Sequence, residues 1–211
     1  MASVSSRLRQ NCPARARRGV SEHEARQSCS GRGASLSRGP PGDMADEDVK
    51  IHAGAVVSGE ADIRGDVTIH PRSAVHPKAV ILADPGKPIV IGSGNIVEER
   101  AYITSKDAAV TIGDSNHLHA GCRLQSCQLG DGNIVEPNSS VGSGCTLQNA
   151  CVVGALVSVP ERTTLASGTV VYGRPNSEHV LPQPEAELVR ARKETIDKEL
   201  ELLQKVFTKT P

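Results

Sequence analysis

Histidines are the residues of this 211-residue chain best suited to hold a metal ion or carry a proton. His52 and His70 stand 18 residues apart, and His76, Glu98 and His119 form a second spaced set. Zinc accepts imidazole nitrogens and carboxylate oxygens as ligands, so metal binding is the chemistry to test against the rest of the sequence.

A six-residue repeat must position these side chains. From Leu129 to Val171 an aliphatic residue stands at every sixth position, and the same spacing extends back to Ile51, broken by two insertions and one deletion. Most hexads also carry a small residue four positions after the aliphatic one. Helices favour a period near 3.6 and half-buried strands a period of 2, and neither fits. The repeat predicts an all-β fold: a left-handed parallel β-helix of about seven coils over residues 49–175, with three hexads per coil.

The three faces of this β-helix decide how the histidines lie. His52 and His70 fall on one face in successive coils, and His76, Glu98 and His119 form a ladder on the next face. Side chains on adjacent rungs run nearly parallel rather than converging, which disfavours a metal site. We therefore expect hydrogen-bonded ladders and predict no metal ligand, no cofactor and no catalytic residue.

Two charged residues near a turn, Arg64 and Asp66, are further candidates for contacts between coils or subunits. Together with His76, Glu98 and His119 they make up the predicted structural and interface residues. Both insertions, at residues 84–87 and 105–108, follow the third face, an edge that either binds a partner or simply tolerates extra residues.

The cysteines show no CxxC pair, which favours a reduced cytosolic compartment. Cys122, Cys145 and Cys151 occupy small inward positions and are predicted to pack in the core, whereas Cys127 is less constrained. No apolar run approaches the roughly 18 residues that span a bilayer, so we expect no membrane insertion.

The flanks differ from the repeat. Residues 1–43 are rich in Arg, Ser, Gly and Pro and are predicted to be disordered, with a transit peptide as the alternative. Residues 184–207 predict an amphipathic helix, which either folds back on the β-helix or binds a partner. Its apolar stripe is Ile196, Leu200, Leu203 and Phe207.

Several segments resemble the γ-class carbonic anhydrases: residues 63–67, Gly94-Asn-Ile-Val and Val110-Thr-Ile-Gly. That resemblance implies three zinc-binding histidines, yet the matching positions hold Ile103, Asp114 and His119. A zinc ion that generates hydroxide needs three protein ligands and an open position, so the resemblance does not extend to catalysis.

A closer resemblance, from Val49 to about Gly173, is to the dynactin subunit 6 family of pointed-end hexapeptide-repeat proteins. It is carried by residues 49–57, 63–69, 76–79 and 88–92 and by the closing Val171-Tyr-Gly. This resemblance implies a hetero-dimer with dynactin subunit 5, contacts with other pointed-end dynactin subunits and an indirect link to the dynein complex. It also implies cargo or adaptor binding during microtubule transport in the cytoplasm and cytoskeleton.

The predicted function is therefore a non-catalytic structural or adaptor subunit. The alternative is an enzyme, either a γ-carbonic-anhydrase-like metalloprotein or a hexapeptide acyltransferase that binds coenzyme A. Nucleic-acid binding through the Arg-rich leader is a third possibility, but it rests only on the charge of that segment. We expect no nucleic-acid partner.

Overall fold

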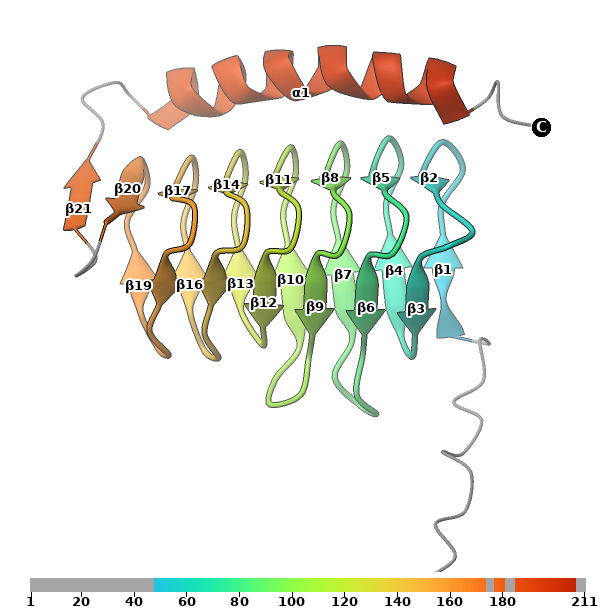
Figure 1. Cartoon of the computed structure of the whole chain (residues 1–211), viewed down its shortest axis with the longest axis horizontal. Helices are drawn as coiled ribbons and strands as arrows, with labels where there is room; N and C mark the ends of the chain where they lie inside the picture. Colours follow the sequence, from blue (N-terminus) through green and yellow to red (C-terminus); the bar gives the residue numbers. More distant parts are fainter. Residues whose placement is uncertain (1–47, 174–176, 181–184, 208–211) are drawn as a thin grey trace, which may run out of the picture. The chain divides into compact units, whose positions relative to one another are not determined.

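The computed structural model describes residues 48–173, 177–180 and 185–207 (Figure 1). All described residues belong to one compact unit, Pro41–Pro211. For residues 177–180 and 206–207 only the backbone is described. The predicted leader over residues 1–43 lies outside the described residues.

Short strands stack into three sheets, one for each face of the predicted β-helix. Sheet A contains β1 (Lys50–Ile51), β4 (Val67–Ile69), β7 (Ile89–Ile91), β10 (Val110–Ile112), β13 (Gln128–Leu129), β16 (Thr146–Leu147) and β19 (Thr164–Leu165). Sheet B contains β2 (Val56–Val57), β5 (Ala74–Val75), β8 (Ile96–Val97), β11 (His117–Leu118), β14 (Ile134–Val135), β17 (Val152–Val153), β20 (Thr169–Tyr172) and β21 (Ser177–Val180). Sheet C contains β3 (Asp62–Arg64), β6 (Val80–Leu82), β9 (Tyr102–Thr104), β12 (Arg123–Gln125), β15 (Ser140–Val141) and β18 (Ser158–Val159).

Strand pairing follows the aliphatic repeat and confirms the predicted parallel β-helix. Ile51 pairs with Ile69 in sheet A, and Val135 pairs with Val153 in sheet B. The repeat aliphatics point inward, and those from Ile69 to Val171 are at most 3% exposed. Burying one aliphatic side chain contributes about 1.5–3 kcal/mol, so repetition in every hexad stabilises a core that contains almost no aromatic residues.

Both insertions lie at the corner between sheets C and A, as predicted. The loops between β6 and β7 and between β9 and β10 are the long ones, and the deletion shortens the loop between β12 and β13. The strand register is the same on both sides of an insertion or deletion, because Ile69 pairs with Ile91 and Ile112 with Leu129. The aliphatic of each coil thus stays inward whatever the length of its corner.

A ladder of buried asparagines links four successive coils at the corner that precedes sheet B. The Asn116 N–H donates to Asn95 Oδ1 at 2.8 Å, and the Asn133 N–H donates to Asn116 Oδ1 at 2.8 Å. The Cys151 N–H completes the series by donating to Asn133 Oδ1 at 2.8 Å. These amides satisfy buried backbone donors at positions where the strands themselves provide no acceptor.

One strand was not predicted. β21 turns back and pairs antiparallel with β20, with Val170 opposite His179. The sequence pattern stops after Tyr172, and a four-residue strand outside the repeat has no periodicity from which to predict it. The last coil of sheet B therefore ends against a strand of opposite direction.

Helix α1 (Glu185–Phe207) runs along sheet B, across the strands labelled β17 to β2 in Figure 1. The outward residues of sheet B are mostly apolar, and Ala74 and Ile96 form a buried cluster with Ile196 and Leu200 of the helix. At the start of α1, the Asn149 side chain donates a hydrogen bond to Glu185. Among the described residues, no helix is both long and apolar enough to cross a membrane.

Candidate functional site

His52 and His70 stack across one coil, as the repeat predicts. Their ring centroids lie 4.8 Å apart, with an angle of 11° between the planes. Within the described part of the chain, neither ring has a carboxylate partner. This pair is a ladder of two imidazoles on the outside of the β-helix.

The second predicted ladder forms differently. His76 does not join Glu98 and His119; its Nδ1 lies 3.0 Å from Glu99 Oε1 in the next coil. The expected ladder fails because Glu98 is engaged by two other imidazoles, those of His117 and His119. Glu98 faces the coil after its own, and Glu99 is the residue that reaches back to His76.

Glu98, His117 and His119 form a compact cluster at the end of β8 and β11. Glu98 Oε1 lies 2.7 Å from His117 Nε2 and 3.0 Å from His119 Nδ1. The Ala120 N–H donates to Glu98 Oε2 at 2.8 Å and so fixes the carboxylate. The two imidazole rings stack with centroids 3.8 Å apart and planes at 22°. One potential ligand atom from each residue lies within 4.8 Å of the others.

The charges of the cluster follow from burial and from its hydrogen bonds. Burial raises the pKa of Glu98, but the hydrogen bond from His117, the charge of His119 and the Ala120 N–H outweigh that effect, so its pKa lies below the ordinary value. Burial beneath α1 and the charge of His119 lower the pKa of His117. At neutral pH the cluster therefore holds an ionised carboxylate beside an uncharged His117 imidazole.

His117 is the residue of this cluster that the sequence interpretation did not select. Its side chain points outward from sheet B, yet it is only 8% exposed because α1 covers it. The sequence contains a usable clue. Outward positions of sheet B read Val56, Ala74, Ile96, His117, Ile134, Val152 and Val170, so one imidazole interrupts an apolar row.

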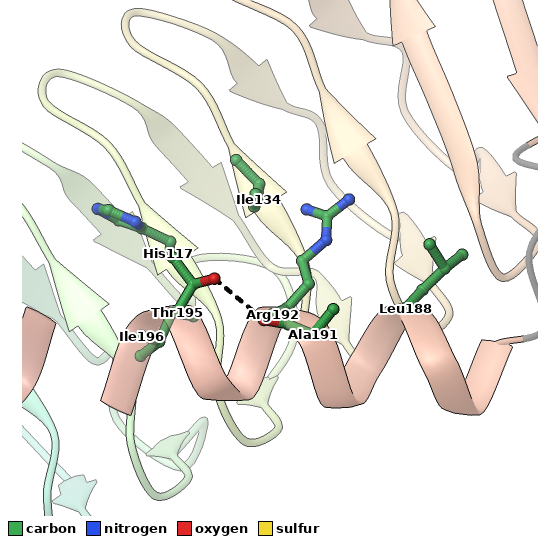
Figure 2. A pocket seen from close by; sticks show the side chains of 7 residues that line it. All are labelled: His117, Ile134, Leu188, Ala191, Arg192, Thr195 and Ile196. Atoms are coloured by element: carbon green, nitrogen blue, oxygen red, sulfur yellow. Dashed lines mark hydrogen bonds between the residues drawn. The ribbon is translucent and has the colours of Figure 1, made fainter. Parts of the chain in front are cut away.

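A groove of about 270 Å³ lies beside this cluster, between sheet B and α1 (Figure 2). Figure 2 shows Arg192 extending from the helix towards Ile134, with His117 on one side of it and Leu188 on the other. Arg192 Nη1 is buried and makes no hydrogen bond with the residues that the structure describes. Burial lowers the pKa of the Arg192 guanidinium. The groove is thus mainly apolar, with one cationic and one imidazole side chain.

Arg64 forms an ion pair with Asp62, through Nε–Oδ1 and Nη2–Oδ2 contacts of 2.6 and 3.0 Å along the same strand, and a role of Arg64 and Asp66 in contacts between coils or subunits stays a prediction. One further expectation needs correction. Cys127 is fully buried in the core, because the one-residue deletion before Leu129 draws it inward. Burial raises the pKa of its thiol to about 12. Cys122, Cys145 and Cys151 are buried in the core, as predicted.

Three of the four residues in the predicted apolar stripe of α1 pack against the β-helix. Ile196 and Leu200 are 3% exposed against sheet B, and Leu203 packs against the same cluster. The side chain of Phe207 lies outside the described residues. The described part of the stripe therefore faces the β-helix.

The positions of the carbonic anhydrase zinc ligands are not brought together. Ile103 is fully buried in the core. Asp114 Oδ1 accepts a hydrogen bond from the Ser93 N–H at 2.7 Å, and it is not part of the Glu98 cluster. His119 alone of the three positions retains an imidazole, and it turns to Glu98.

Comparison with known structures supports the fold. A hexapeptide transferase family protein from Anaplasma phagocytophilum superposes with a TM-score of 0.64 at 21% identity, covering 73% of this chain and 90% of that one. At this identity the likeness concerns the fold alone. A scan against protein-family models gives no match.

The sequence relatives identify a family, which the structural comparison does not. Dynactin subunit 6 of Xenopus tropicalis is 40% identical over 137 residues, which cover 59% of this chain and 68% of the relative. Dynactin subunit 6 of Danio rerio is 41% identical, with 59% and 70% covered, and that of Nematostella vectensis is 36% identical, with 64% and 82% covered. The aligned segments cover most of the length of each of these relatives. The chain belongs to the dynactin subunit 6 family.

Proposed function

We propose that this chain is a non-catalytic structural subunit of a dynactin pointed-end complex, where it pairs with dynactin subunit 5. Through the other pointed-end subunits it would support dynein-driven microtubule transport, and cargo or adaptor binding, in the cytoplasm and cytoskeleton. The proposal rests on the similarity to dynactin subunit 6 relatives. The structure adds one observation that bears on how a partner could bind.

The two ends of the β-helix differ in how well their inward residues are covered. Ile51, the inward aliphatic of the first strand, is 49% exposed, and Val57 and Ile63 of the same coil are only half-buried. At the other end, Leu165 and Val171 are 1% and 2% exposed. An apolar coil end with open strand edges is a surface that another β-helix could cover by stacking. We infer that the first coil is the face that contacts dynactin subunit 5.

Co-purification with dynactin subunit 5 tests this proposal. Ile51→Arg places a charge on the exposed coil end, and we expect it to reduce recovery of the partner at least tenfold, the effect of about 1.4 kcal/mol. Leu156→Arg is the matched control, because Leu156 is 60% exposed on a turn of a later coil. Equal recovery of dynactin subunit 5 by Ile51→Arg and wild type would reject the first coil as the interface. Failure of the wild-type chain to recover any pointed-end subunit would reject the dynactin role itself.

The non-catalytic role is supported by the residues at the positions of the related enzymes. Ile103 cannot bind zinc, and its burial in the core leaves no room for a ligand there. Absence of carbon dioxide hydration and of acyl transfer from acetyl coenzyme A, measured on the purified chain, is the expected result. Turnover in either assay that is lost in a His119→Ala variant would overturn it.

A further inference from the structure

The cluster of Glu98, His117 and His119 combines two imidazoles and a carboxylate across two coils. Such a donor set matches the ligands of zinc, which prefers nitrogen and sulfur donors and accepts carboxylate oxygen. Both imidazole nitrogens approach the same oxygen, at 2.7 and 3.0 Å. Ligand atoms of a tetrahedral zinc ion lie about 3.3 Å apart. The two oxygen–nitrogen separations are close to this value, and all three candidate atoms lie within 4.8 Å of one another.

The groups around the cluster have the arrangement that orients metal ligands. Ala120 N–H holds Glu98 Oε2, leaving Oε1 directed at the imidazoles. On the far side of His117, Nδ1 faces Glu199 Oε2 of α1 at 3.8 Å. When the Nε2 atom of His117 binds a metal, its proton resides on Nδ1, and a carboxylate opposite that nitrogen favours this tautomer.

Access to the cluster is also suitable. The side chains of Glu98 and His119 are 20% and 27% exposed, whereas that of His117 is 11% exposed. An ion can therefore enter from the His119 side and retain water as its fourth ligand. Because the two rings stack, His119 must turn its ring for both lone pairs to meet at one ion. His119, as the more exposed of the two histidines, is the one with room to do so.

From this geometry we propose that Glu98 Oε1, His117 Nε2 and a ring nitrogen of His119 bind one divalent transition-metal ion of the zinc type. This site differs from the one implied by the resemblance to γ-class carbonic anhydrases, which would need Ile103 and Asp114. The ion ties the coil containing β8 to the coil containing β11. It also holds His117 beneath α1, and no residue of a partner protein is needed to complete the site.

Cobalt(II) titration of the full chain, first stripped of metal with a chelator, tests the site. We expect saturable visible absorption typical of low-coordinate cobalt at one ion per chain, reversed by adding zinc. Glu98→Gln keeps the size of the side chain and removes its charge, and His119→Gln removes one nitrogen at a partly exposed position. Each should weaken cobalt affinity by roughly 100-fold.

Two matched controls separate this site from other histidines. His70→Gln breaks a stacked imidazole pair, and His76→Gln breaks an imidazole–carboxylate pair, yet both leave the cluster intact. Neither should change cobalt affinity. Bound metal should also raise the melting temperature of the wild type but not of Glu98→Gln, because the ion binds only the folded state.

No saturable absorption by the wild-type chain would overturn the proposal. Equal affinity in the wild type, Glu98→Gln and His119→Gln would do the same. Circular dichroism of each variant establishes that it is folded. If Glu98→Gln is not folded, His119→Gln alone decides the outcome.

Discussion

The Arg72 guanidinium donates a hydrogen bond to Asp197 Oδ1 at 2.7 Å, joining a turn of the β-helix to helix α1 across 125 residues of sequence. The two side chains are 53% and 30% exposed. Ion pairs in such a solvated position typically contribute 0–1 kcal/mol. We therefore attribute docking of the helix mainly to apolar packing and expect this ion pair to add little.

A double-mutant cycle measures that contribution. Arg72→Ala, Asp197→Ala and the double variant should give a coupling energy below about 1 kcal/mol in urea unfolding. Raising the salt concentration should reduce the coupling further, because the exposed charges are screened. A coupling well above this value at high salt would show that the ion pair, rather than apolar packing, governs docking.

Leu200 tests the apolar contribution directly. It is 3% exposed beside Ala74 and Ile96, and Leu200→Ala should destabilise the docked helix by about 2–5 kcal/mol. Hydrogen exchange of the α1 amides provides the measurement, with faster exchange expected in the variant. Leu202→Ala is the control, because Leu202 is 63% exposed on the same helix and its loss should change stability by less than about 0.5 kcal/mol.

The asparagine ladder predicts a cost for removing one amide. In Asn116→Ala the buried Asn133 N–H loses its acceptor, which should lower the free energy of unfolding by about 1–3 kcal/mol. Chemical denaturation would measure the loss. Asn138→Gly alters an exposed asparagine at φ 55° and should stay within about 0.5 kcal/mol of wild type. Similar destabilisation in both variants would contradict the ladder's role.

Alanine substitutions at two glycines can separate the cost of a positive φ from the cost of a close contact. Gly65 and Gly86 both have positive φ, at 82° and 73°, so alanine costs each about 1–2 kcal/mol. A Cβ at Gly65 would also lie 2.3 Å from the Ala83 carbonyl oxygen, whereas one at Gly86 meets nothing within 4 Å. Thermal unfolding should thus show Gly65→Ala to be less stable than Gly86→Ala by about 1–3 kcal/mol. Equal melting temperatures would rule out the close contact.

The buried thiols predict a loss of stability at alkaline pH. Burial raises the pKa values of Cys122 and Cys127 from 9.0 to about 12. Between these values the unfolded chain releases thiol protons that the folded chain retains, so the free energy of unfolding should fall as pH rises. Each thiol contributes up to about 1.4 kcal/mol per pH unit in that range.

Urea unfolding at several pH values measures this effect. Cys127→Ala should show a shallower decline above pH 9 than the wild type, because one of the two thiols is gone. Below pH 9 the slopes of the two proteins should agree. An unchanged slope above pH 9 would mean that Cys127 titrates normally in the folded chain.

The β-helix could be predicted well from the sequence because every hexad places one aliphatic residue inward. The same repeat placed His52 above His70 and the insertions at one corner. Cys127 was misjudged because it lies in the one hexad that is shortened, where counting by six fails. β21 was missed because a strand that pairs antiparallel after the last coil does not take part in the repeat.

The candidate metal cluster was less predictable because it depends on the outer surface of sheet B. A period of six specifies which residues face inward, but the burial of His117 depends on where a distant helix packs. Glu98 and His119 could be selected as a pair from their positions in the repeat. Only the docking of α1 shows that His117 is buried beside them.

The antiparallel pairing of β21 with β20 makes the two ends of sheet B different. A parallel solenoid could in principle lengthen at either end by adding further parallel strands, including those of another copy. In sheet B the far edge of β20 is already occupied by a strand running the opposite way, while β2 has no such neighbour among the described strands. A further parallel strand, including one from another copy, therefore cannot pair with this edge of β20.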